Sequence, residues 1–324
     1  MNSQPAAAER RVTAIIPVFN REAFLPACLD SVLAQTYPHI EVIVIDDGSI
    51  DGTPGVLARY GDRIRVLRQE NAGPYVARNR GIAESRGELV TFIDSDDRIA
   101  PQKIARQVTH LAAHPAAVLV YTHVAYRDVS GRRWVPREQS MLRGDLAREM
   151  VRSFGAQIPW PTALVRRAAL ERTGAFDTRH RVAMDRELGI RLAQLGPFEL
   201  IPAPLYEYRL HPDQISQDLE PREAAARYIL GRLAHVAPHG NDHRLLTAAE
   251  AQMHLQLARL AYIRGVDDRA RQHLAAALRA DPALARDRSV QLLRVKSRLG
   301  RGAVRRIGRL VGRRAGGWSG PRRA

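Results

Sequence analysis

Three aspartates, Asp94, Asp96 and Asp97, directly follow the apolar run LVTFI at residues 89–93. Two carboxylates a few ångströms apart repel each other by about 3 kcal/mol at an effective dielectric constant near 20, so this spacing needs a cation or solvent to relieve it. Acid clusters of this kind supply the oxygen ligands that Mg²⁺ and Mn²⁺ prefer, and Mg²⁺ often takes one or two carboxylates together with substrate phosphates. The cluster therefore predicts a divalent-metal site that also receives a diphosphate.

A second acidic pair, Asp46 and Asp47, lies in the stretch IDDGSIDGT at residues 45–53. An Asp-Gly sequence with small polar neighbours is typical of an ordinary turn that also supplies capping residues. A carboxylate such as that of Asp47 can equally accept hydrogen bonds from a nucleobase or a ribose. The sequence is compatible with both interpretations.

The elements that must position these acids alternate between strands and helices in the first half of the chain. Runs rich in Val, Ile and Leu read VTAIIPV, EVIVI, IRVL, LVTFI and AVLVYT, and segments with helical spacing of apolar residues lie between the early ones. This alternation predicts an α/β fold with a mostly parallel, Rossmann-like sheet and helices on both faces. Such sheets bind ligands beyond the carboxyl ends of their strands, which is where the acidic loops fall.

Two classes of nucleotide-binding protein, dinucleotide-binding Rossmann proteins and P-loop proteins, are excluded because their motifs do not occur. The first strand continues into PVFNR, without the Gly-x-Gly-x-x-Gly that a dinucleotide site requires, and no Gly-Lys-Ser or Gly-Lys-Thr of a Walker loop is present. The single cysteine, Cys28, allows no intramolecular disulfide and indicates a reducing compartment. No signal-peptide core and no run of about 20 apolar residues occurs. From the missing apolar segments and the single cysteine, we expect a cytoplasmic protein without a membrane-spanning segment.

Taken in order, three segments of the chain resemble the family 2 glycosyltransferases, which have the GT-A fold. They read TAIIPVFNRE, LDSVLAQTYPHIEVIVIDDGSIDGT and QENAGPYVARNRGIAESRGELVTFIDSDD, and the resemblance covers roughly residues 11–216. It implies transfer of a sugar from a nucleoside diphosphate sugar to an acceptor hydroxyl with inversion, using Mg²⁺ or Mn²⁺ held by an Asp-x-Asp motif. The acceptor is expected to be a glycan, a lipid-linked compound or another hydroxyl compound, in the synthesis of a cell-envelope or exported polysaccharide or glycoconjugate.

The resemblance assigns roles to individual residues. Asp96 matches the metal-binding acid of the Asp-x-Asp motif, and His211 matches a family histidine that faces the metal or the diphosphate, although a lone histidine is equally compatible with a structural role. Asp97 falls outside this spacing and is expected to cap the helix that Pro101 helps to begin. Contacts with the base, ribose, sugar or diphosphate of the donor are expected from Pro17, Phe19, Asp47, Arg78 and Asp94.

The catalytic base is expected at Asp185. Family members usually show Glu-Asp-x-Asp before a Leu-rich helix, and here the same four positions hold Met184, Asp185, Arg186 and Glu187. A carboxylate that takes the proton of the acceptor hydroxyl typically accelerates such a reaction 10²- to 10⁴-fold. Asp185 is also compatible with a helix-capping role, and Met184 suggests an altered acceptor preference. Trp160 either stacks on a sugar or belongs to the core.

Four segments are expected along the chain: a disordered N-terminus (1–10), the GT-A domain (11–216), a tetratricopeptide-like helical extension (217–285) and a basic tail (286–324). The tail contains thirteen Lys or Arg and a single acid, Asp287, and so carries most of the net charge of +16. Its patterned apolar residues, including Leu292, Val295 and Leu299, are compatible with a helix lying on an anionic membrane at its inner face, and equally with a solvated tail. Nucleic-acid binding is not expected, because Trp318 is the tail's only aromatic residue.

These motifs favour an inverting, metal-dependent glycosyltransferase. The alternative is a non-catalytic protein that binds a nucleotide sugar or acts as a scaffold, as Met184 and the tetratricopeptide-like helices suggest. Turnover of a donor by the purified protein separates the two hypotheses.

Overall fold

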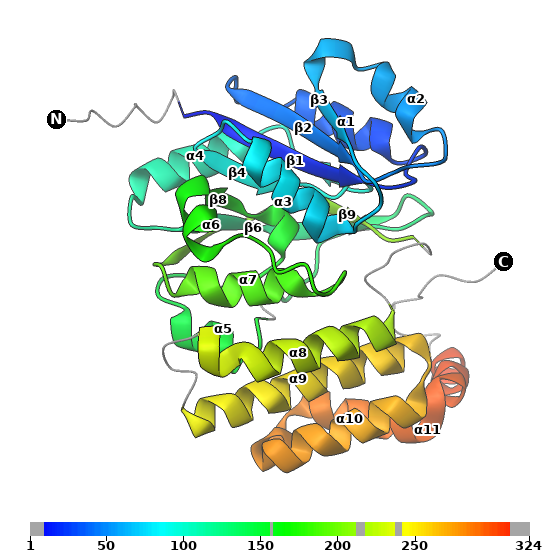
Figure 1. Ribbon diagram of the computed structural model, residues 1–324. Coiled ribbons are helices and arrows are strands. Elements are labelled where there is room, and N and C mark those ends of the chain that lie inside the picture. Colours follow the sequence, from blue (N-terminus) through cyan, green and yellow to red (C-terminus); the bar gives the residue numbers. More distant parts are fainter. Residues whose placement is uncertain (1–9, 156–157, 212–217, 237–241, 312–324) are drawn as a thin grey trace. The chain divides into compact units, whose positions relative to one another are not determined.

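The computed structural model describes residues 10–155, 158–211, 218–236 and 242–311 (Figure 1). The chain forms two compact units, one of Met1–Met150 with Gly155–Asp213 and one of Val151–Phe154 with Gln214–Ala324. Residues 1–9 and 312–324, where a disordered N-terminus and the end of the basic tail are expected, lie outside the described residues. The same holds for Trp318.

The first unit contains one mixed sheet, which has nine strands in the described part of the chain. Its order is β3-β2-β1-β4-β8-β6-β9-β5, and β7 pairs with β6. The strands are β1 (Val12–Val18), β2 (Ile40–Asp46), β3 (Arg65–Arg68), β4 (Leu89–Phe92), β5 (Arg98–Ile99), β6 (Leu119–Arg127), β7 (Arg133–Trp134), β8 (Leu164–Arg166) and β9 (Phe198–Arg209).

The five apolar runs of the sequence form β1, β2, β3, β4 and β6. Parallel pairing, which the sequence predicts for most of the sheet, joins β3, β2, β1 and β4, and also β6 with β9. Among the strands that follow β4 in the chain, β8 runs antiparallel to β4 and β6, and β5 and β7 are antiparallel to their neighbours. The α/β sheet with helices on both faces is thus confirmed. Its strands β1 to β4 pair in parallel, and the pairing of the remaining strands is mixed.

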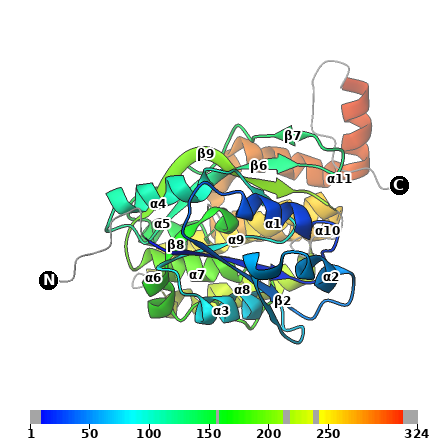
Figure 2. The ribbon, with the colours of Figure 1, turned by 90° about the horizontal axis from the view of Figure 1, so that it is seen from above.

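Helices cover both faces of this sheet, which explains why β1 is buried along its whole length. Successive side chains of a strand point to opposite faces. Ala14 and Ile16 share a core with α1 (Leu25–Leu33), α2 (Thr53–Ala58) and α4 (Lys103–Ala113). On the other face, Ile15 lies so close to Gly81 of α3 (Pro74–Glu84) that a Cβ there would be 2.4 Å from its Cγ2. Figure 2 shows α1 and α3 on opposite sides of the sheet.

Further helices of the first unit are short. They are α6 (Arg167–Thr173) and α7 (Met184–Ala193), with 3₁₀ turns at Gly61–Arg63 and Trp160–Thr162. A third short helix, α5 (Ala147–Arg152), begins in this unit, and its last two residues are assigned to the second. The helix predicted from the pattern DRELGIRLAQLG is α7. The next element in the chain is β9. The first turn of α7 and the end of β9 both contribute residues to the candidate site.

In the described residues of the second unit, all regular secondary structure is helical. It contains α8 (Leu219–Val236), α9 (His243–Arg264), α10 (Asp267–Ala280), a 3₁₀ turn (Pro282–Arg286) and α11 (Arg288–Val311). The α9–α10 pair confirms the helical character predicted for this region, and its tetratricopeptide-like classification stays a prediction. A small core joins α9, α10 and α11 through Leu255, Ala258, Leu274, Ala277, Val290 and Leu293.

Two local features define α9 and α11. The Asp242 side chain accepts hydrogen bonds from the amides of Arg244 and Leu245, which caps the start of α9. Non-helical backbone at Gly300, with φ of 72°, interrupts α11. None of the helices in the described ranges combines the length and the apolar character needed to span a bilayer.

Candidate active site

The candidate site lies where parallel strands end at one edge of the sheet. In the register of β1 and β2, Val18 pairs with Asp46, and the amide of Asp47 donates to the carbonyl of Val18 at 2.9 Å. Three residues expected to contact the donor therefore meet here: Pro17 is buried, Phe19 is 37% exposed and Asp47 follows β2. β4 ends beside β1, with Phe92 paired to Ile15, and carries the DSDD loop to the same edge.

Asp47 organises the loop that leads into α3. Its Oδ1 accepts hydrogen bonds from Gln69 Nε2 at 2.8 Å and from the Ala72 amide at 2.9 Å, and its Oδ2 accepts one from the Gly73 amide at 2.8 Å. The side chain is buried, and these bonds leave about one of its four lone-pair sites for a ligand. Gly48 has a φ of 83°, and a Cβ there would meet the Asn71 amide nitrogen at 3.0 Å. The turn interpretation thus describes Asp47 in this structure, and a donor contact remains a prediction.

Asp94 forms an ion pair with Arg78. Arg78 Nη2 donates to Asp94 Oδ1 at 2.5 Å, and its guanidinium lies over the rings of Tyr75 and Phe176, 5.3 and 5.7 Å from their centroids. Burial raises the pKa of Asp94 above its ordinary value, the charge of Arg78 opposes this rise, and the charge of Asp96 adds to it. Arg78 therefore relieves part of the repulsion that the acid cluster creates.

Asp96 and His211 form the second pair of the acid loop. His211 Nε2 lies 2.9 Å from Asp96 Oδ2, and Arg21 Nε lies 3.6 Å from the same oxygen. The His211 ring stacks on Phe24 with centroids 4.5 Å apart. Burial acts to raise the pKa of Asp96, but the His211 hydrogen bond and the charge of Arg21 outweigh it, so that the pKa is lowered. Asp96 is thus ionised at neutral pH.

Asp96 and His211 fit a divalent cation. Two neighbouring ligands about 2.1 Å from an octahedral ion lie about 3 Å apart, which matches the 2.9 Å between Asp96 Oδ2 and His211 Nε2. His211 Nδ1 is buried and has no hydrogen-bond partner among the described residues, so the ring is fixed by Phe24 and Asp96. A carboxylate with an imidazole suits Mn²⁺ and is compatible with Mg²⁺.

Asp97 does not cap a helix, and the sequence-based expectation for it is wrong. It is fully buried and accepts hydrogen bonds from Tyr206 Oη at 2.7 Å and from the Arg209 amide at 2.8 Å. The next helix, α4, begins at Lys103 after an N-cap at Gln102. Burial, together with the charges of Asp96 and Asp94, raises the pKa of Asp97 well above its ordinary value. Asp97 thus ties the acid loop to the end of β9.

Asp185 lies in the first turn of α7 and contacts the residues around Asp94. Tyr75 Oη donates to Asp185 Oδ1 at 3.2 Å and accepts from the Met184 amide at 3.1 Å. Arg78 interacts electrostatically with both Asp94 and Asp185. No side chain caps α7, whose N-cap is Ala183 at a φ of 63°, so the capping alternative for Asp185 is not observed. The structure therefore brings the predicted base to the acid loop.

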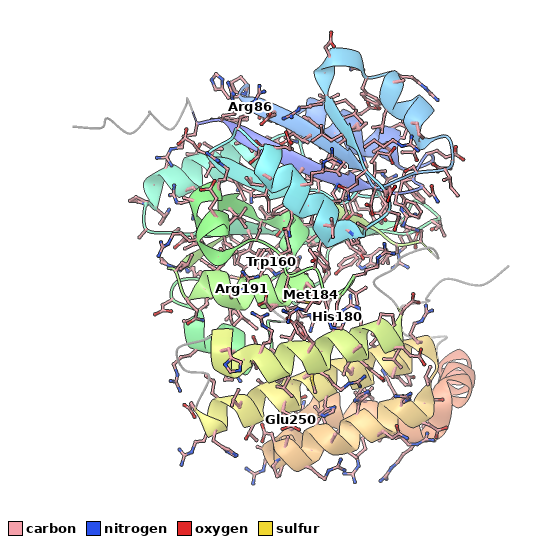
Figure 3. All side chains as sticks on the ribbon, in the orientation of Figure 1. Arg86, Trp160, His180, Met184, Arg191 and Glu250 are labelled. Atoms are coloured by element: carbon pink, nitrogen blue, oxygen red, sulfur yellow. The ribbon has the colours of Figure 1, made fainter. Side chains whose placement is uncertain are left out.

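Two other residues of the Asp185 motif, Met184 and Glu187, face the interior. The side chains of Met184 and Glu187 are fully buried, and Figure 3 labels Met184 and Arg191 along α7. Arg191 Nε donates to Glu187 Oε1 at 3.0 Å, and Arg191 Nη2 donates to the carbonyl of Ala175 at 2.7 Å. Glu187 therefore anchors the connection from α6 to α7, and Asp185 is left as the partly exposed acid of the motif.

Trp160 belongs to the core. It is 5% exposed, and a Cβ on Gly189 of α7 would lie 2.5 Å from its Cζ2. Of the two interpretations that the sequence left open, the structure favours packing over stacking on a sugar. Trp160 also lies beside α7 in Figure 3.

The sequence motifs do not indicate the residues that hold the acids in place by hydrogen bonds. Tyr75 orients Asp185, and Tyr206 also accepts a hydrogen bond from the Asp94 amide at 3.3 Å. The Arg209 guanidinium donates to the carbonyls of Asp96 and Phe24. The available signal was position: Arg21 directly follows PVFN, and Tyr206 and Arg209 alternate along the extended run that ends at His211.

Solved structures define the class of this fold as GT-A glycosyltransferase. The crystal structure of residues 1–349 of Staphylococcus aureus TarS has a TM-score of 0.60 at 20% identity, covering 84% of this chain and 81% of that one. The mannosyltransferase PcManGT from Pyrobaculum calidifontis, in complex with GDP-Man and Mn²⁺, has a TM-score of 0.57 at 22% identity, covering 91% and 86%. At these identities the likeness establishes the fold.

The family follows from the sequence model of glycosyl transferase family 2, which matches residues 13–174. This is half of the chain, and the chain belongs to that family. Glycosyltransferase GlyA of Streptococcus pneumoniae is 36% identical over 37% of this chain and 18% of its own length. EpsH of Bacillus subtilis, described as a glycosyltransferase, is 35% identical over 37% and 36%. The matched part of the chain thus spans about a fifth to a third of these relatives.

A longer match has lower identity. The uncharacterized glycosyltransferase RT0329 of Rickettsia typhi is 28% identical over 73% of this chain and 77% of its own length. The fold and family predicted from the sequence motifs are confirmed.

Proposed function

We propose that this chain transfers a sugar from a nucleoside diphosphate sugar to an acceptor hydroxyl with inversion at the anomeric carbon. The observation that supports this most directly is the convergence of Asp94, Asp96 and Asp185 at one edge of the sheet, with Arg78 and Tyr75 between them. Two related folds are described in complex with nucleotide sugars, TarS with UDP-GlcNAc and PcManGT with GDP-Man. A sugar nucleotide is therefore the donor class that we propose.

In the proposed reaction, the acceptor oxygen forms a bond to the anomeric carbon as the bond to the diphosphate breaks. Asp185 takes the proton of the acceptor hydroxyl, because its Oδ1 is held by Tyr75 while Oδ2 has no hydrogen-bond partner among the described residues. Asp94 binds the ribose or the sugar, and Asp47, Pro17 and Phe19 bind the nucleoside. Arg78, whose guanidinium pairs with Asp94, contributes positive charge near the diphosphate.

Asp96 and His211 are the proposed holders of Mg²⁺ or Mn²⁺. Asp96 is ionised because of His211 and Arg21, and its distance to His211 Nε2 suits neighbouring ligands on one ion. Such a cation would neutralise the charge of the departing diphosphate. Arg21, whose Nε lies 3.6 Å from Asp96 Oδ2, also balances the negative charge of Asp96.

Purified Asp185→Asn and Asp96→Asn variants test this proposal. With Mn²⁺ and UDP-GlcNAc or GDP-mannose as donors, Asp185→Asn should lower transfer by about 10²- to 10⁴-fold while donor binding persists. Asp96→Asn should abolish the Mn²⁺-dependent thermal shift that the donor produces. Glu171→Gln, at an exposed position of α6, is the matched control and should keep full activity. Full activity in both aspartate variants would overturn the proposal.

The same experiment separates an enzyme from a non-catalytic binding or scaffolding protein. A protein of that kind would bind the donor with Mn²⁺ but release no nucleoside diphosphate with any acceptor pool. Met184, which suggested this alternative, is a buried residue whose amide bonds to Tyr75, so its side chain is not part of the exposed site. We therefore favour the enzyme, acting on a hydroxyl acceptor in the synthesis of a polysaccharide or glycoconjugate.

We also propose that α11 contacts an anionic membrane, at the cytoplasmic face. Leu292, Val295 and Leu299 are 52%, 54% and 49% exposed, whereas Val290 and Leu293 are buried on the other side of the helix. The exposed apolar residues lie among basic side chains, and each basic residue near anionic headgroups contributes about 1 kcal/mol. Apolar residues beside basic ones are typical of helices that lie in the membrane interface.

Vesicle co-sedimentation of the full chain tests this contact. A Leu292→Ser, Val295→Ser, Leu299→Ser triple variant should lose binding to vesicles that contain phosphatidylserine at low salt, and added salt should weaken binding of the wild type. Vesicles of phosphatidylcholine alone are the control. If the triple variant sediments with the anionic vesicles as the wild type does, the proposed membrane contact is wrong.

A further inference from the structure

A cluster of metal-binding side chains lies at the amino end of β9, whereas the candidate active site lies near its carboxyl end. His110 is in the last turn of α4, His114 is the C-cap of the same helix, and Glu199 is the second residue of β9. One ligand atom from each of the three lies within 4.8 Å of the others. His110 Nε2 lies 3.2 Å from Glu199 Oε2.

The hydrogen bonding of His114 leaves one ring nitrogen available to a metal. Its Nδ1 lies 2.8 Å from the carbonyl oxygen of His110, and because a carbonyl can only accept, Nδ1 must carry the hydrogen. In the neutral ring, Nε2 then keeps its lone pair. Histidines that bind metals typically donate their other ring N–H to a carbonyl or carboxylate in this way, which fixes the tautomer and the ring orientation.

The spacing of the first two ligands suits a tetrahedral ion. Ligands about 2.0–2.2 Å from a tetrahedral Zn²⁺ lie about 3.3–3.6 Å apart, close to the 3.2 Å between His110 Nε2 and Glu199 Oε2. The rings of His110 and His114 stack with centroids 4.3 Å apart and planes at 16°. His114 is exposed, and its ring can move the short distance that closes the triad.

The surroundings also favour a cation at this end of α4. The C-terminus of a helix carries a partial negative charge. Arg166 already donates to the carbonyls of Leu111 and His114, at 2.9 and 3.3 Å, so two of the terminal carbonyls have partners without the imidazoles. The positive charge of Arg166 lowers the affinity of the site for a metal. Arg166 donates to backbone carbonyls, so it does not occupy the ring nitrogens of the two histidines.

We propose that His110, His114 and Glu199 form a second metal site, which binds Zn²⁺ or a neighbouring transition metal and fastens the end of α4 to the start of β9. Two imidazoles and one carboxylate are a donor set for such ions and not for Mg²⁺, and the fourth position is left to water. The site is independent of the proposed sugar transfer, because none of its residues contacts the acid loop.

A second histidine pair, His254 and His273, lies beside an acid but does not meet the requirements of a metal site. In the second unit, His254 Nδ1 and His273 Nδ1 lie 2.9 Å apart, and His273 Nε2 lies 2.9 Å from Glu223 Oε1. Both ring nitrogens of His273 are thus engaged with other side chains. Arg269 also binds Glu223, so the acid has a cationic partner already. At His114, by contrast, one ring nitrogen remains for a metal.

Titration of the metal-free full chain with Zn²⁺, and with Co²⁺ as a spectroscopic probe, tests the proposal. The wild type should bind one equivalent of Zn²⁺ with a rise in Tm, and bound Co²⁺ should show the strong visible absorption of tetrahedral coordination. His114→Ala and Glu199→Gln should each weaken this binding by at least about 10-fold, since even loss of an outer partner of a metal ligand costs that much. His243→Ala, at an exposed histidine of α9, is the control and should bind as the wild type does.

Asp96→Asn distinguishes this site from the proposed catalytic one. In the absence of nucleotide, the Zn²⁺ equivalent and its Tm rise should persist in Asp96→Asn, and sugar transfer should persist in His114→Ala. Binding of Zn²⁺ by His114→Ala and Glu199→Gln with wild-type affinity would overturn the proposal, as would loss of the equivalent in Asp96→Asn. Because His114 is exposed, its replacement does not endanger the fold.

Discussion

Tyr75 Oη lies 3.2 Å from Asp185 Oδ1, a hydrogen bond between residues 110 positions apart in the chain. The hydroxyl also accepts from the Met184 amide, so its hydrogen is directed at the carboxylate. Burial, followed by the charge of Asp185, raises the pKa of Tyr75 well above its ordinary value, which keeps the hydroxyl protonated. Tyr75 thus fixes one oxygen of the proposed base and leaves the other for the acceptor.

Tyr75→Phe should lower kcat by about 10- to 100-fold, because a hydrogen bond to a charged group contributes about 1.5–3 kcal/mol. The KM of the donor should change little, since the ring that lies beside Arg78 is kept. Steady-state kinetics measures both. Tyr60→Phe is the matched control: Tyr60 Oη bonds to Asp30 Oδ1 at 2.9 Å, away from the acid loop, and its loss should leave kcat unchanged. Equal kinetics for the two variants would contradict the role of Tyr75.

The sequence predicts the residues that follow strands better than it predicts their partners. Asp94 and Asp96 lie at the carboxyl edge because parallel strands bring their ends together, which a periodic pattern reveals. The capping role expected of Asp97 is wrong because its partner Tyr206 is 109 residues away on β9, and nothing local indicates that contact. Met184 is fully buried at the start of α7, directly after Ala183 with its φ of 63°. Such long-range packing and backbone geometry leave no spacing pattern in a single sequence.

Glu187→Gln should lower the free energy of unfolding by about 3–5 kcal/mol, because it leaves Arg191 without its buried partner. Glu187 is fully buried, and Arg191 Nη2 lies 2.5 Å from its Oε2. Arg167 and Glu171 form the matched control, an exposed pair with the same i,i+4 spacing at 2.8 Å. Glu171→Gln should cost less than about 1 kcal/mol. Urea denaturation compares the two, and a loss for Glu187→Gln as small as that expected for the control would contradict the structural role of the Glu187 pair.

Lys103→Met should stabilise the protein more at low pH than at high pH. The Lys103 ammonium is fully buried, with Gln107 Oε1 at 2.9 Å and Thr91 Oγ1 at 3.3 Å, and burial lowers its pKa to about 7. Between about pH 7 and pH 10.4 the unfolded chain binds more protons than the folded one, so the stability of the wild type rises with pH through this window. The advantage of the methionine variant should therefore shrink by up to about 3–5 kcal/mol from pH 6.5 to pH 10.

Chemical denaturation of wild type and variant, side by side at fixed pH values, measures that difference. Below about pH 7, Lys103 is protonated in both the folded and the unfolded protein. The stability difference between the methionine variant and the wild type should therefore not change with pH there. A gain that is the same at pH 6.5 and pH 10 would show that Lys103 is not a buried cation in the folded protein.

Gly189→Ala should destabilise the protein by about 1–3 kcal/mol, because the added Cβ would lie 2.5 Å from Trp160 Cζ2 and 2.9 Å from Met150 Cε. Gly231→Ala in α8 offers the opposite case, since nothing lies within 4 Å of a Cβ there. Alanine in a helix is favoured over glycine by about 0.5–1 kcal/mol, so this variant should gain stability. Thermal unfolding should move the two Tm values in opposite directions, and a shift in the same direction would contradict the packing of Trp160 on α7.

Cys28 is the chain's only thiol, and it is buried with Sγ 3.5 Å from the carbonyl oxygen of Asp94. Burial, with the nearby charges of Asp97 and Asp96, raises its pKa well above the ordinary value, so thiolate is scarce in the folded state. A maleimide or disulfide reagent should therefore react with Cys28 only when α1 separates from the acid loop. The chain thus carries a built-in reporter, because its rate of alkylation measures how often the floor of the candidate site opens, without any label having to be introduced.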